Sequence, residues 1–178
     1  MAPYHRPMPR FLPALLLALA AAACSPTFNW RELRVEGTPL HIMLPCKPDK
    51  AMRRMPIAGA QVELEVLGCE TGGATFAILH ANLQDASQSS DVLVQWNRAT
   101  LANLRGEATS ARAFMPLGAT PMAGAQRVSA VGKRQDGSAV RGEAAYFARG
   151  AQVFQAVVYA TEPRPEWLHP FFDGLRFE

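Results

Sequence analysis

The three cysteines are the residues of this chain with the clearest chemistry, and their number is odd. Cys24 ends an apolar run, whereas Cys46 and Cys69 lie farther along the chain, in the contexts "LHIMLPC" and "VELEVLGC". Cysteines of exported proteins usually pair as disulfides, so an odd count calls for a separate role for one of them. The chain has no C-x-x-C motif, which disfavours a metal-binding or redox pair.

The segment before Cys24 has the three zones of an export signal. Residues 1–10 carry Arg6 and Arg10 and no acid, residues 11–23 are apolar, and small alanines precede the cysteine. The apolar run has about 13 residues, whereas a membrane-spanning helix needs roughly 20. We therefore expect residues 1–23 to be a signal peptide that is removed. The formal net charge then falls from +3 to +1, because both arginines leave with it.

The sequence "LAAAAC" followed by Ser25 resembles the lipobox of bacterial lipoproteins, with Ala21 where that family favours leucine. The resemblance implies that Cys24 becomes the first residue and carries acyl chains such as palmitate. Two or more such chains hold a protein firmly in a bilayer. Ser25 implies sorting to the outer membrane, facing the periplasm, in a Gram-negative source. Ordinary secretion, with Cys24 as a free or pairing thiol, is the alternative.

If Cys24 is acylated, Cys46 and Cys69 remain as an even pair in an oxidising compartment, where disulfides persist. Each follows a predicted strand, so neighbouring strand ends would bring the two sulfurs together. Closing a loop of about 24 residues contributes roughly 3 kcal/mol in the chain-entropy model. We expect a Cys46–Cys69 disulfide.

Strand patterns occupy most of the remaining chain. In "QVELEVL", residues 61–67, apolar and polar side chains alternate, which predicts a half-buried strand with Glu63 and Glu65 turned to solvent. "ETGG" predicts a hairpin turn and "QDGS" a second one. The expected strands are residues 30–35, 40–44, 61–67, 74–81, 126–133, 140–148, 152–160 and 175–177, with a short one at 113–117. Residues 152–160 are apolar on both faces, as expected of a central strand.

The segment "DASQSSDVLVQWNRATLANLRG" predicts the main helix. Leu93, Trp96 and Leu104 fall on one apolar stripe with Thr100 and Leu101. Ser89 or Ser90 is expected to cap its start, and Gly106 to mark its exit. A proline-led helical turn is expected before the last strand.

Together these patterns predict an α+β fold: a twisted antiparallel sheet with one long amphipathic helix and a short C-terminal helix. The expected organisation is residues 1–23 as the signal peptide, 24–29 as a lipidated tether, and 30–178 as a single domain.

Two longer segments carry a family resemblance. "FNWRELRVEGTPLHIMLPCKPD" and the closing "FFDGLRFE" resemble the first strands and the last strand of PsbP-like domains, and the intervening element order agrees. "LPCKPD" and "GCETGGATF" also resemble segments of small uncharacterised bacterial lipoproteins. These families imply a PsbP-like α/β sandwich that binds or assembles other proteins, and they supply no catalytic set.

Other candidate chemistry has weaker support. His80 shares a strand face with Phe76 and Ile78, which is typical of a core or edge histidine. The chain has no H-E-x-x-H, G-x-S-x-G or P-loop motif, and its methionines are too scattered to predict a copper site. A loop is expected at residues 47–58, and its basic part, from Lys47 to Arg54, is a solvated loop or a contact for anionic lipid.

The sequence therefore predicts an envelope lipoprotein that is not an enzyme, has no cofactor, and has a protein-binding, assembly or structural role. Its partners would be the lipid bilayer, through Cys24, and an envelope protein. Nucleic acid is not expected, because no extended basic face is present. The alternative is a lipoprotein that binds a small molecule or metal in the groove between sheet and main helix, using His41, His80 or a methionine.

Overall fold

The computed structural model describes residues 27–57 and 60–178 of the chain. Within these residues, ten strands, two α-helices and one short 3-10 helix follow one another. In chain order they are β1 (Arg31–Arg34), β2 (Leu40–Leu44), β3 (Asp49–Ile57), β4 (Ala60–Thr71), β5 (Ala74–Asn82), η2 (Ala86–Gln88), α2 (Ser89–Asn103), β6 (Glu107–Ala113), β7 (Gln126–Lys133), β8 (Ala139–Arg149), β9 (Gln152–Ala160), α3 (Pro165–Asp173) and β10 (Arg176–Phe177). The predicted α+β class is confirmed. No helix of these two segments is long and apolar enough to cross a membrane.

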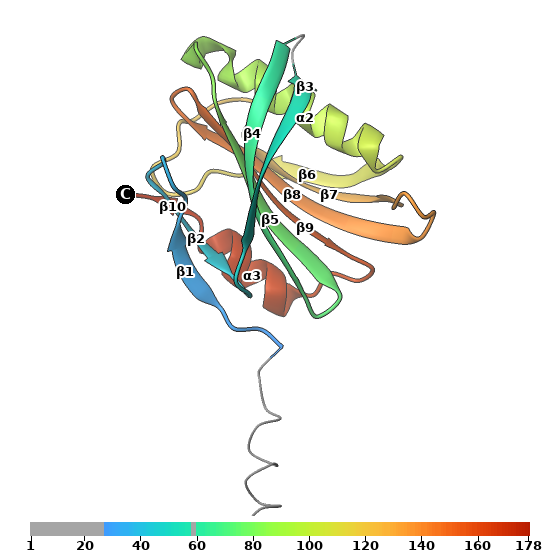
Figure 1. Ribbon diagram of the computed structural model, residues 1–178. Coiled ribbons are helices and arrows are strands. Elements are labelled where there is room, and N and C mark those ends of the chain that lie inside the picture. The colour runs from blue at the N-terminus through green and yellow to red at the C-terminus, as the bar shows by residue number, and fades with distance from the viewer. Residues whose placement is uncertain (1–26, 58–59) are drawn as a thin grey trace, which may run out of the picture.

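The strands form two antiparallel sheets. The large sheet has seven strands in the order β3-β4-β5-β9-β8-β7-β6, and the small sheet has the order β1-β2-β10. Helix α2 covers one face of the large sheet, and the small sheet and α3 lie against the other (Figure 1). The domain is therefore built from three layers around one large sheet.

Each face of the large sheet has its own core, because successive side chains of a strand point to opposite faces. On β9, Val153 and Val157 pack in the cluster under α2, whereas Phe154 and Val158 pack under the small sheet and α3. Strand β9 is the fourth of the seven strands. This confirms the prediction of a central strand that is apolar on both faces.

The predicted loop at residues 47–58 is wrong, because most of it forms β3. This strand is an edge of the large sheet and pairs with β4 from Asp49↔Gly68 to Ile57↔Ala60. Edge strands tolerate prolines and charged side chains, so Pro56 does not prevent pairing. Arg54 lies opposite Glu63, and this cross-strand pair of opposite charges favours the register.

The predicted caps of the main helix are also wrong. The Ser89 hydroxyl donates to the Gly150 carbonyl, and the Ser90 hydroxyl accepts from the Gly124 amide. The Asp85 carboxylate instead accepts from the Ser87 amide at the start of η2. At the other end Arg105, and not a glycine, adopts the left-handed conformation, with φ 44°. The serines hold neighbouring loops against the helix instead of satisfying its first turn.

The short strand expected at residues 113–117 lies earlier in the chain. Strand β6 covers Glu107–Ala113 and pairs with β7 as the second edge of the large sheet. Leu117 makes a single parallel bridge to Arg176 instead. The segment "EATSARA" has few apolar residues, and all seven of its residues are exposed. Its sequence therefore has no alternating apolar pattern that would predict a strand.

Candidate functional site

The large sheet divides at one end, where β4 and β5 separate. Their pairing runs from Thr71↔Ala74 at the turn to Glu65↔His80. Beyond that pair β4 continues to Ala60 along β3, and β5 continues to Asn82 along β9. The β3–β4 hairpin therefore extends past the end of β5, close to α2 (Figure 1). We call the space between this hairpin and the β5–α2 connection the notch.

The notch contains a cavity of about 560 Å³, which is within the range of small-molecule sites. Three carboxylates line it: Glu63 and Glu65 from β4, and Asp85 from the β5–α2 connection. Val62, Leu83 and Val92 contribute apolar side chains, and several amide side chains complete the rim. The cavity thus combines an acidic side with an apolar one.

His80 lies at the base of the notch and is only 5% exposed. Its Nε2 lies 3.2 Å from Oε2 of Glu65, an ion-pair contact, and among the described residues neither ring nitrogen has a partner with full hydrogen-bond geometry. Burial lowers the pKa of His80 below its ordinary value of 6.5, and the nearby Glu65 only partly opposes this. The ring is therefore neutral near pH 7, with one N–H and one acceptor nitrogen, both buried. A buried polar group without a partner costs about 1–3 kcal/mol.

The polar side chains buried under α2 are satisfied, in contrast to His80. The Gln155 amide donates to the Thr100 hydroxyl at 2.9 Å and to the Tyr146 hydroxyl at 3.0 Å. Burial raises the pKa of Tyr146 to about 12, so the phenol stays protonated. This trio stabilises the helix–sheet contact and leaves no buried group for a ligand.

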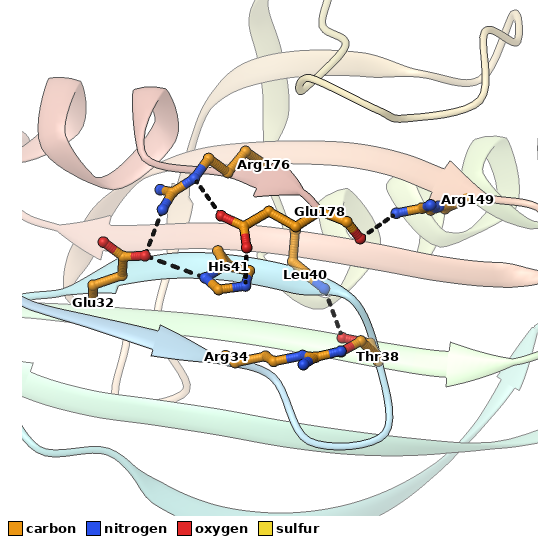
Figure 2. A network of polar contacts seen from close by, with 8 residues as sticks. All are labelled: Glu32, Arg34, Thr38, Leu40, His41, Arg149, Arg176 and Glu178. Atoms are coloured by element: carbon orange, nitrogen blue, oxygen red, sulfur yellow. Dashed lines mark hydrogen bonds and ion pairs between the residues drawn. The ribbon is translucent and has the colours of Figure 1, made fainter.

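A second histidine, His41, lies in a polar network on the small sheet (Figure 2). Its Nδ1 is 3.2 Å from Glu32 on β1, and its Nε2 is 3.2 Å from the Glu178 carboxylate. Arg176 of β10 donates to Glu32 and lies 3.4 Å from Glu178. Hydrogen bonds from His41 and Arg176 lower the pKa of Glu32. The network joins all three strands of the small sheet and is accessible to water.

The cysteines of the sequence prediction lie as follows. Cys46 and Cys69 are joined by a disulfide with a Cα–Cα distance of 6.0 Å. Cys46 follows β2 of the small sheet and Cys69 belongs to β4, so the bond connects the two sheets. Cys24 lies outside the described residues.

The histidines and methionines considered above do not gather in the groove under α2. The cavity there, of about 420 Å³, is lined by Met55 but by no histidine. His41 is on the small sheet, His80 is in the notch with Met52, and His169 pairs with Asp173 on α3. Among residues 27–57 and 60–178, no three His, Cys, Asp or Glu side chains are arranged to hold a metal ion.

The pairing of Glu65 with His80 was missed, although the sequence contained a signal for it. Gly72 and Gly73 both have positive φ, as a two-residue hairpin turn requires. Such a turn places Thr71 opposite Ala74, and the antiparallel register then places Glu65 opposite His80. The alternating pattern predicts that Glu65 faces solvent, but its side chain is only 25% exposed.

Comparisons with known proteins do not assign a family. No protein-family model matches the chain, and no curated protein matches it. A similar solved structure is that of PA94 from Pseudomonas aeruginosa, a protein of unknown function. It is 15% identical, with a TM-score of 0.34, and the match covers 79% of this chain and 86% of that chain. A similarity this low carries no inference about function.

Proposed function

We propose that this protein is a lipid-anchored envelope protein without enzymatic activity, which displays a binding surface away from the membrane. The export signal ending in "LAAAAC" supports the anchor at Cys24. The observation that carries the proposal is the contact of Thr27, three residues after Cys24, with Thr71 at the β4–β5 turn, the end of the β4–β5 pairing away from the notch. The PsbP-like resemblance of residues 28–178 agrees with a binding or assembly role.

The first described residues are packed on the domain. The Thr71 hydroxyl donates to the Thr27 carbonyl, and the Asn29 amide donates to the Pro45 carbonyl at 2.8 Å. The Phe28 ring packs 5.3 Å from that of Trp167, and it lies over Gly72, where a Cβ would be 2.5 Å from the ring. These contacts hold the chain against the β4–β5 turn and α3.

Because the chain is packed on the domain from Thr27 onward, only two residues separate the proposed anchor at Cys24 from the packed part of the chain. A chain advances at most about 3.6 Å per residue, so an acylated Cys24 lies within about 11 Å of Thr27. The half-buried aromatic side chains of Phe28, Trp30 and Trp167 would then face the lipid headgroups, a position that tryptophan favours.

The same anchor would turn the notch outward. Glu65 is six residues from Thr71 along β4, a distance of about 20 Å at 3.3 Å per residue. The notch would therefore face the aqueous compartment, within reach of a ligand or a partner.

The anchor is tested by replacing Cys24 with alanine in the full chain. We expect the variant to move from the membrane fraction to the soluble fraction and to lose metabolic labelling with palmitate. Ser25→Ala is the matched control and should stay membrane-bound. If the Cys24→Ala protein still sediments with membranes, the anchor is wrong.

The binding role is tested with a photoactivatable crosslinking residue at Gln84, on the rim of the notch. We expect a specific adduct with one envelope protein, identified by mass spectrometry. The same residue at Gln135, in the β7–β8 connection, is the control. Equal adducts from both positions, or none from either, would contradict a protein-binding role for the notch.

A further inference from the structure

The lining of the notch is acidic. Glu63, Glu65 and Asp85 contribute carboxylates, and no lysine or arginine is among the described residues that line the cavity. Two cations of β3 lie near these carboxylates, and one of them, Lys50, also interacts electrostatically with Glu65. Arg54 lies 3.7 Å from Glu63, with both side chains largely exposed, and the Lys50 ammonium bonds to Glu36 of the β1–β2 connection. A cavity lined by one sign of charge concentrates ligands of the opposite sign.

Glu65 differs from the other two carboxylates in its surroundings. Its side chain is 25% exposed, whereas that of Glu63 is 57% exposed. Less contact with water strengthens the interaction of a charge with an ion placed beside it. Glu65 is therefore the carboxylate best placed to bind a cation.

His80 is a second, independent indication of a ligand. Its ring is buried against Phe154 at the base of the cavity, and within the described parts of the chain both of its nitrogens lack a hydrogen bond of full geometry. Buried polar atoms are nearly always paired in native proteins, and an unpaired one requires an explanation. Its Nε2 lies 3.2 Å from Oε2 of Glu65, so a cation bound by Glu65 would lie beside this ring.

We infer that the notch binds a small organic cation, a primary ammonium on an aliphatic chain, with the Glu65 carboxylate beside His80 as the acceptor of its N–H groups. The aliphatic chain would lie on Val62 and Leu83, and a second ammonium would reach Asp85. This inference goes beyond the membrane anchor proposed above and does not depend on it. The ammonium can belong to a free amine or to a lysine side chain of a peptide, and both present the same chemistry to the notch.

The test is calorimetric titration of purified protein with 1,5-diaminopentane. We expect saturable binding that weakens in 0.5 M NaCl, because salt screens the carboxylates. 1,5-Pentanediol has the same chain without charge and should not bind. A parallel titration with lysyl-glycine separates a peptide source from a free amine: tighter binding of the dipeptide assigns a peptide, and tighter binding of the diamine assigns a free amine.

Two substitutions locate the site. Glu65→Gln removes the charge at similar size and should weaken diaminopentane binding by about tenfold or more, as for loss of a charged hydrogen bond. Glu70→Gln, on the same strand but at the turn end, should bind like the wild type. Should Glu65→Gln not fold, Glu63→Gln changes an exposed residue of the same cavity and should still weaken binding.

Nuclear magnetic resonance of the histidine rings distinguishes ligand binding at the notch from a purely structural role of Glu65. The His80 ring signals should shift on addition of the diamine, while those of His41 and His169 stay in place. The inference is overturned if diaminopentane does not bind, if pentanediol binds equally well, or if the His80 signals do not respond.

Discussion

Two histidines of this protein lie next to carboxylates, in opposite surroundings. His41 lies on the small sheet, where both ring nitrogens are 3.2 Å from a carboxylate oxygen (Figure 2). His80 is buried in the notch, 3.2 Å from Glu65, and neither of its nitrogens has a well-formed hydrogen bond to residues 27–57 or 60–178. The paired histidine is the one that water reaches, and the unpaired one is buried.

This difference separates a structural network from a candidate binding site. A surface histidine that lost its partners would bond to water, so the His41 network contributes little to stability. The unpaired nitrogens of His80 have no such replacement, and they reduce the stability of the ligand-free protein. A position that weakens the fold and lines a cavity is typical of a functional site.

The largest effect is expected from the disulfide that joins the sheets carrying these two histidines. Replacing Cys46 and Cys69 with alanine should lower the free energy of unfolding by about 3 kcal/mol, because the unfolded chain gains conformational freedom. For a domain of about 150 residues this lowers Tm by roughly 6–12 °C. Scanning calorimetry measures it. Adding a reductant should lower the Tm of the wild type close to that of the variant. Cys24→Ala alone should leave Tm unchanged.

The second prediction tests the difference between the two histidines by replacing each of them with leucine. His80→Leu keeps a similar volume and removes two unpaired buried atoms, so it should raise the free energy of unfolding by about 1 kcal/mol or more. Tm should rise by about 2–4 °C for each kcal/mol. His41→Leu is the matched control and should not stabilise the protein. If His80→Leu destabilises the protein instead, the ring has a partner in solution and the notch is a structural pair.

The third prediction concerns pH and follows from the lowered pKa of His80. In the unfolded chain this histidine titrates near 6.5, and in the folded protein it titrates lower. The unfolded state therefore binds more protons below pH 6.5, and stability is lost as the pH falls through this range. Tm should fall between pH 7.5 and 5.5, and the fall should be smaller in His80→Leu. Equal falls in both proteins would refute the buried neutral ring.

Most of the large sheet was predictable because its strands carry a regular hydrophobic pattern. Residues 126–133 and 152–160 have the predicted bounds, and the Asp-Gly turn joins β7 and β8 as expected. Strand β3 was missed because Pro48, Pro56 and four basic residues are typical of a loop. Only its position at the sheet edge, beside the acidic residues of β4, makes that composition compatible with a strand.

The two histidine sites also differ in how far they could be predicted from the sequence. The Glu65–His80 pair could be predicted from one local turn, because Gly72 and Gly73 set the register. Its burial could not, because His80 packs against Phe154 of β9, a contact between strands that are distant in the sequence. The His41 network joins residues 144 positions apart, Glu32 and Arg176, which meet only because β10 pairs with β2. No local sequence pattern predicts the pairing of β10 with β2.

The smallest effect should come from the His41 network itself. Glu32→Gln removes the carboxylate that accepts from His41 and Arg176. The site is exposed, so water and salt replace much of the interaction, and Tm should fall by less than about 2 °C. The fall should disappear in 1 M NaCl, where charges are screened within about 3 Å. A fall as large as that caused by loss of the disulfide, or one that persists in salt, would mean that the network holds the small sheet together. The two histidine sites would then both be structural, and the contrast between them would no longer single out the notch.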